Sequence, residues 1–173
     1  MISKNLNDEL NKQITYEFYS SHLYLAMAAK FASIDFTGAS TWMKTQAEEE
    51  RIHAIKIMDF IIEAGGEAKI TGFEDPEVKG EDLKSIFEQA LEHERFVTER
   101  INFLMSLAGD EKNYAAVNFL NWFVNEQVEE EENAQNIIDN LRMIKDNGYG
   151  LYMLDKELGA RVYTQAAPLA NKA

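Results

Sequence analysis

The sequence contains no cysteine, only two prolines and no long apolar run. Without cysteine the chain can form neither disulfides nor thiolate metal sites, so any bound metal must be held by carboxylate, imidazole or amide groups. The two prolines, Pro76 and Pro168, leave long stretches in which a helix can continue without a break. No window is apolar enough to span a bilayer, and the first residues do not resemble a signal peptide. We therefore expect a cytoplasmic protein that has no membrane partner.

Positive charge is also scarce. There are 17 lysines and arginines against 30 aspartates and glutamates, which gives a formal net charge of −13. A chain with this balance repels nucleic acid and anionic membranes and attracts cations, although the same excess of charge also serves plain solubility. The composition predicts no nucleic-acid partner and is compatible with cation binding.

The 173 residues suit one domain, which we expect to cover residues 1–173. Apolar residues recur at helical spacing in five stretches, and the pair Gly65-Gly66 ends the second of them. The predicted helices are residues 4–33, 39–64, 82–108, 112–145 and 151–166.

The connections between these stretches predict the topology. The first and second helices, and the third and fourth, are joined by short links and should be antiparallel neighbours. The link "GGEAKITGFEDPEVKG" is long enough, at about 53 Å when extended, to travel the roughly 40 Å length of a helix. The third helix can then start at the end where the second one started. We predict an all-α four-helix bundle with one long crossover and a short fifth helix.

Each core-facing stripe is apolar at both ends and acidic in its middle. Glu17, Glu50, Glu94 and Glu130 each lie near the midpoint of a different predicted helix. Midpoints of bundled helices share one level whether the neighbours are parallel or antiparallel. We therefore expect four carboxylates to meet at mid-height in the core.

Metal ions explain why these carboxylates can be buried, because an unpaired buried carboxylate costs several kcal/mol. Glu50 and His53 are spaced as the Glu-x-x-His unit of di-iron bundles requires, and Gln127 adds an amide at the same level. Oxygen ligands with one imidazole suit Fe(II), Mn(II) or Zn(II), and open coordination positions favour iron. Glu50 is best placed to bridge two ions. The coincidence of four carboxylates at one level is the strong signal, since each alone is common on helices.

Two further sets of residues leave alternatives open. Glu49, Glu126 and Glu129 flank the central set and are either a solvated helix face or a further cation site that shares Glu130. Tyr24 lies two turns from the first central carboxylate and is either an ordinary core tyrosine or a redox participant.

Histidines outside the Glu-x-x-His unit have simpler interpretations. His22 points away from the core stripe, which indicates packing at the surface. His93 faces away from the central set and is predicted to be structural or exposed.

Five motifs together resemble a non-haem bacterial ferritin over essentially the whole chain. They are "ITYEFYSSHLYLAMA", "AEEERIHAIKIMDF", "LEHERF", "FLNWFVNEQVEEEE" and "GYGLYMLDKEL". The resemblance implies a ferritin-like fold, a ferroxidase that oxidises Fe(II) with O2 or H2O2, and ferric oxyhydroxide stored in a cage of twenty-four subunits.

The resemblance also implies a set of site residues. The first iron would be held by Glu17, Glu50 and His53, and the second by Glu50, Glu94 and Glu130. The third iron site of bacterial ferritins would be formed by Glu49, Glu126, Glu129 and Glu130. Gln127 would line the site near the bound oxygen species, and Tyr24 would be the tyrosine beside the di-iron centre.

Departures from related families refine this prediction. The haem-binding relatives carry Met directly after the glutamate that corresponds to Glu50, where this chain has Arg51, and a second Glu-x-x-His where it has Gln127-x-x-Glu130. We therefore expect no haem. Two rival hypotheses remain: a di-metal oxidase or peroxidase of the same fold that stores nothing, and a structural bundle that binds no metal.

Overall fold

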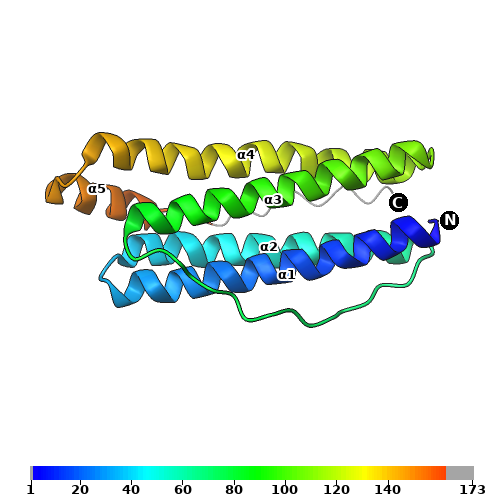
Figure 1. Cartoon of the computed structure of the whole chain (residues 1–173), viewed down its shortest axis with the longest axis horizontal. Coiled ribbons are helices and arrows are strands. Elements are labelled where there is room, and N and C mark those ends of the chain that lie inside the picture. Colours follow the sequence, from blue (N-terminus) through cyan, green and yellow to red (C-terminus); the bar gives the residue numbers. More distant parts are fainter. Residues whose placement is uncertain (1, 163–173) are drawn as a thin grey trace.

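Residues 2–162, the part described by the computed structural model, form four long helices with a short fifth helix at one end (Figure 1). The helices are α1 (Lys4–Ser33), α2 (Thr37–Glu63), α3 (Leu83–Asp110), α4 (Tyr114–Ile144) and α5 (Gly148–Leu158). There is no strand among these residues, and the predicted all-α bundle with a short fifth helix is confirmed. None of these five helices is long and apolar enough to cross a membrane.

The long link between α2 and α3 travels the length of the bundle beside α1, as Figure 1 shows. Gly65 ends α2 in the left-handed region, with φ 76°, which a residue without a side chain adopts at little cost. Asn7 and Asn11 of α1 then hold the link in place. Their side-chain oxygens accept hydrogen bonds from the backbone N–H groups of Glu67 (3.0 Å) and Lys69 (2.6 Å). The predicted crossover is therefore fixed to the bundle by polar side chains.

The core is split into two apolar halves. One half combines residues 23–31 of α1 and 39–47 of α2 with residues 83–91 of α3 and 134–141 of α4. The other half combines residues 6–14, 54–61, 97–108 and 116–123 of the same helices. Between the halves, each helix contributes buried polar side chains. This layer is the level at which the four carboxylates were predicted to meet.

Several helices begin or end a few residues from the predicted positions, and capping residues explain the starts of α4 and α5. The largest difference is at α5, which was predicted at residues 151–166 but begins at Gly148 and ends at Leu158. The side chain of Asn147 caps its start by accepting a hydrogen bond from the backbone N–H of Gly150 at 3.1 Å, and Gly159 follows its end. Residues 163–166 of the prediction lie outside the described part of the chain.

Smaller shifts occur at the starts of two long helices. Helix α2 begins at Thr37, two residues earlier than predicted. Helix α4 begins at Tyr114, two residues later than predicted, because the side chain of Asn113 accepts a hydrogen bond from Ala116 and caps it.

One carboxylate of α5 is hydrogen-bonded to the start of α2. The side-chain oxygens of Asp155 accept hydrogen bonds from the backbone N–H groups of Gly38 (3.1 Å) and Ala39 (2.8 Å). These N–H groups belong to the first turn of α2, which has no partner for them within the helix. A side chain at position 38 would collide with the backbone carbonyl of Asp155, so the two helices approach closely here.

Replacing Asp155 by alanine is expected to lower the free energy of unfolding by about 1–2 kcal/mol, because two helix N–H groups lose their acceptor. Urea unfolding would measure the loss, and hydrogen exchange would place it at α5. The control is Asp139→Ala on α4, where an exposed aspartate pairs with Arg142 of the same helix. An equal effect of the two substitutions would contradict the anchoring role of Asp155.

Candidate metal centre

Four helices each place one carboxylate in the polar layer between the two apolar halves. Glu17, Glu50, Glu94 and Glu130 are 1%, 2%, 2% and 6% exposed. They come from α1, α2, α3 and α4 respectively. The structure therefore buries, at one level, all four carboxylates that the helix midpoints predicted.

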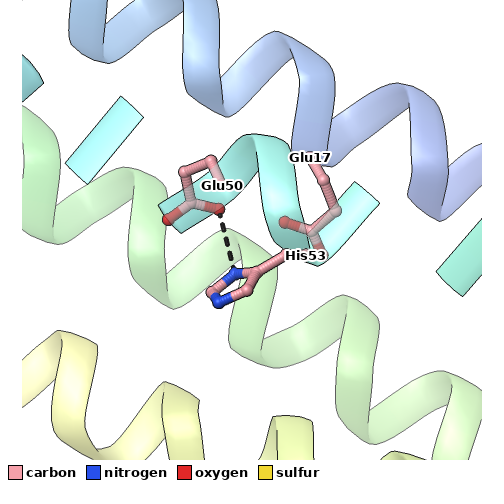
Figure 2. Close-up of side chains that lie close together, drawn as sticks. All are labelled: Glu17, Glu50 and His53. Atoms are coloured by element: carbon pink, nitrogen blue, oxygen red, sulfur yellow. Dashed lines mark ion pairs between the residues drawn. The ribbon is translucent and has the colours of Figure 1, made fainter. Parts of the chain in front are cut away.

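Glu17, Glu50 and His53 form the tightest group. Each offers one ligand atom, and these atoms all lie within 4.8 Å of one another. The spacing of Glu50 and His53 on α2 puts both on one face, with His53 Nδ1 3.4 Å from Glu50 Oε2 (Figure 2). Glu17 approaches from α1. Two carboxylates and an imidazole at this separation can hold one divalent ion.

Glu94 and Glu130 complete the polar layer on the side of α3 and α4, and neighbouring groups fix their orientation. The hydroxyl of Tyr24 donates a hydrogen bond to Glu94. Gln127 Nε2 donates to Glu94 Oε2 at 3.1 Å. The amide of Gln46 donates to Glu130 Oε2 at 2.7 Å and to Glu50 Oε1 at 3.1 Å. These donors hold the carboxylates together although their charges repel.

Burial favours the protonated form of the carboxyl groups in the metal-free centre. It raises the pKa of Glu17 and of Glu94 to about 8, and the nearby charge of Glu50 adds to both shifts. The pKa values of Glu50 and Glu130 are raised for the same reason, since both are buried and lie close to other carboxylates. A divalent cation would replace these protons and favour the charged form.

One oxygen in the centre is buried without any hydrogen-bond partner in the protein. It is Glu17 Oε2, whereas Glu17 Oε1 accepts a hydrogen bond from Gln13 at 2.9 Å. A buried acceptor without a partner is costly, and a metal ion would satisfy it. The donor set therefore fits a metal-bound centre better than a metal-free one.

The flanking acidic residues line a cavity of about 260 Å³ beside the centre. His53, Glu126 and Glu130 place ligand atoms within 4.8 Å of one another there. Glu49 and Glu129 also line this cavity but are not part of that close group. The alternative of a fully solvated face does not describe Glu126, which is half-buried, whereas Glu129 is exposed.

The other two histidines lie outside these groups. His22 is exposed, and its ring packs against Phe73. His93 Nε2 is 2.7 Å from Ser20 Oγ, and burial lowers its pKa to about 4, so the ring is neutral at physiological pH. Both positions agree with the structural or surface roles predicted from the sequence.

Sequence reasoning missed the residues that support the carboxylates. Gln13 and Gln46 lie four positions before Glu17 and Glu50, so their amides reach the carboxylates one turn later. This spacing is a signal that the sequence carries and that could have found them. Arg161 also reaches this region, from 112 positions beyond Glu49, and no local pattern indicates that contact.

A four-helix bundle with buried carboxylates from every helix and one imidazole defines the class of di-metal carboxylate proteins. A family model described as a ferritin-like domain matches residues 7–144. The chain belongs to the ferritin family, whose members store iron, and the resemblance seen in the motifs is confirmed.

Individual relatives match over nearly their whole length. The bacterial non-heme ferritin of Staphylococcus saprophyticus is 40% identical, covering 96% of this chain and 99% of the relative. A probable bacterial non-heme ferritin-like protein of Haemophilus influenzae is also 40% identical, over 92% and 96% of the two chains. Among solved structures, an open pore ferritin of Archaeoglobus fulgidus is 44% identical with a TM-score of 0.92, covering 94% of this chain and 100% of that one.

Proposed function

We propose that this chain is a ferroxidase that oxidises Fe(II) in the polar layer of the bundle and stores the product as ferric oxyhydroxide inside a cage. The observation that carries this proposal is the burial of four carboxylates and one imidazole at one level, with one carboxylate oxygen left without a protein partner. Iron is the substrate and the cargo. Its charge is what makes the buried carboxylates tolerable.

Two Fe(II) ions fit the centre by charge and by ligand number. The first binds to Glu17, Glu50 and His53, and the second to Glu50, Glu94 and Glu130, so that Glu50 bridges the pair. Four carboxylates then neutralise the two divalent ions. Binding displaces the protons that the buried groups hold in the metal-free protein.

Reduction of the oxidant needs two electrons, and each Fe(II) supplies one. With dioxygen as oxidant, two Fe(II) and two protons give two Fe(III) and hydrogen peroxide. With hydrogen peroxide as oxidant, the same electrons and protons give two water molecules. Gln127 lies beside the second ion with its Nε2 toward Glu94, and in this proposal it lines the place where the oxidant binds.

In this proposal Tyr24, like Gln127, lies beside the second ion. Its hydroxyl donates to Glu94, so it orients this ligand beside the proposed second ion. Glu49, Glu126, Glu129 and Glu130 form the third iron site in this proposal. Their place beside the cavity supports a route by which Fe(III) leaves the centre.

Self-association completes the proposal. The ferritin relatives support assembly of this chain with copies of itself, and we infer a cage of twenty-four subunits with α5 at the four-fold axes. An acidic chain of net charge −13 would attract iron to such a cage and seed the mineral. The proposal includes no haem. A cytoplasmic location is a prediction from the sequence.

One experiment tests the function directly. Fe(II) added in air to the metal-free protein is expected to give ferric absorbance much faster than in buffer alone, and size exclusion should then find the iron in a cage-sized particle. Fast oxidation by a dimer without retained iron would instead favour an oxidase of the same fold. No acceleration would favour the structural bundle.

A further inference from the structure

A cation of the protein itself lies in the cavity beside the metal centre. Arg161 follows α5, and its side chain contacts α2. Its Nη2 donates a hydrogen bond to Glu49 Oε2, and its Nη1 donates to Gln46 Oε1 at 2.7 Å. The guanidinium carbon is 4.2 Å from the centre of the Trp42 ring. Three contacts of different kinds thus hold one side chain.

The ion pair between Arg161 and Glu49 is not an ordinary surface pair. Both side chains are 19% exposed, and both residues line the cavity that Glu126 and Glu129 also line. A hydrogen bond between charged groups is stronger where water is partly excluded than at the exposed surface. A metal ion that takes Glu49 as a ligand must therefore compete with the guanidinium for the same oxygen.

The contact with Gln46 extends the influence of Arg161 to the di-metal centre. Arginine has donors only, so it can bind the amide oxygen of Gln46 but not the nitrogen. This leaves Gln46 Nε2 facing the carboxylates, where it donates to both Glu50 and Glu130. Arg161 is therefore a positioning residue, one side chain away from the bridging ligand.

We propose that Arg161 is a built-in competitor of the third cation: it neutralises Glu49 while the third site is empty and is displaced when a divalent ion binds there. Its displacement also frees the Gln46 amide, so occupancy of the third site is coupled to the orientation of the donors at Glu50 and Glu130. This inference rests on the proposed function, because that proposal assigns residues lining the cavity as ligands of a third metal ion.

A merely structural ion pair predicts a different behaviour. If Arg161 only fastened the chain after α5 to the bundle, removing it would lower stability and leave metal affinity unchanged or weaker. A competitor predicts the opposite for the third ion, because its removal leaves Glu49 free for the metal.

The test is a titration of the metal-free cage with Zn(II), which does not change oxidation state, by calorimetry. Arg161→Gln is expected to bind the third Zn(II) about tenfold more tightly than the wild type, equivalent to about 1.4 kcal/mol. The affinity for the first two ions should change by less than this, because their own ligands are intact and only the orientation of Gln46 beside them is affected. Arg142→Gln is the matched control, because Arg142 is half exposed and pairs only with Asp139 among the described residues. The Arg142→Gln substitution makes the same change of charge as Arg161→Gln.

Fluorescence gives a second readout that a change of affinity alone would not produce. The chain has two tryptophans, and Trp122→Phe leaves Trp42 as the only one. Zn(II) should change the emission of Trp42 at the third equivalent, as the guanidinium leaves its ring, and this change should vanish when Arg161→Gln is added. Arg161→Lys keeps the charge without the two-point contact, and its affinity for the third ion should lie between the other two.

Three results separate the outcomes. Equal or weaker binding of the third ion by Arg161→Gln, with the first two ions bound normally, would overturn the role of Arg161 alone. A Trp42 emission that does not respond at the third equivalent would also overturn that role. If neither protein binds two ions at the buried carboxylates, the proposed function fails as well.

Discussion

Replacing Glu50 by glutamine is expected to abolish rapid Fe(II) oxidation while making the metal-free protein more stable. Glu50 is 2% exposed and lies between the other carboxylates, so it is the ligand that both iron ions share in the proposed centre. Glutamine has the same shape but no charge and cannot bridge two cations. Both effects follow from one property of the side chain, which is its buried negative charge.

The expected loss of rate is at least about a hundredfold, since mutation of groups that merely support metal ligands already costs 10–100-fold. The expected gain in unfolding free energy of the metal-free protein is about 1–3 kcal/mol, because the buried Glu50 must hold a proton to be neutral, whereas glutamine is neutral without one. Stopped-flow absorbance would give the rate, and urea unfolding would give the stability. A gain in stability rules out misfolding as the reason for lost activity.

The matched control for Glu50 is Glu48→Gln, two positions earlier on the same helix. Glu48 is exposed and pairs with Arg51 at 3.0 Å, so its removal should leave both rate and stability nearly unchanged. Wild-type oxidation by Glu50→Gln would show that iron reacts elsewhere. A loss of stability would show that its charge is compensated in the metal-free protein by something other than protons.

The sequence predicted the layer of carboxylates because the signal is periodic. A glutamate in the middle of an apolar stripe stands out at helical spacing, and four such glutamates at four midpoints indicate a common level in any bundle. The short and long links then limited the topology to one arrangement. Burial of Glu17, Glu50, Glu94 and Glu130 needed no more than these local patterns.

Contacts between distant segments could not be predicted in the same way. The pairing of Arg161 with Glu49 spans 112 positions and depends on where α5 ends. That end was wrong in the prediction, because apolar residues continue beyond Leu158 while Gly159 already follows the last helical turn. The presence of Arg161 beside the centre is therefore known only from the fold.

The metal-free protein is expected to lose stability as the pH rises from about 5 to about 8. The pKa values of Glu17 and Glu94 are about 8 in the folded chain against 4.5 for a free glutamate, and those of Glu50 and Glu130 are also raised. Between these values the folded state holds protons that the unfolded state has released. Unfolding free energy falls with pH wherever the folded state binds more protons, so the loss begins near pH 4.5 and levels off above pH 8.

The size of this loss follows from the number of buried groups. One pKa unit corresponds to 1.36 kcal/mol, so four raised carboxylates can together account for roughly 5 kcal/mol or more across this range. Urea unfolding would measure this loss of stability. The protein concentration is kept fixed, because the stability of an assembled protein depends on it. Loading with Zn(II) should flatten the dependence, because the cation replaces the protons at every pH in the range.

A variant with glutamine in place of all four glutamates provides the decisive comparison. It has no carboxylate in the layer to protonate, so its stability should change little with pH, and Zn(II) should stabilise it far less than the wild type because only the flanking residues of the third site remain. If the metal-free wild type were equally insensitive, the carboxylates would have to be ionised and compensated within the protein. The buried layer would then be a network of protein groups that compensate one another, and the proposal of a metal centre between the four helices would be wrong.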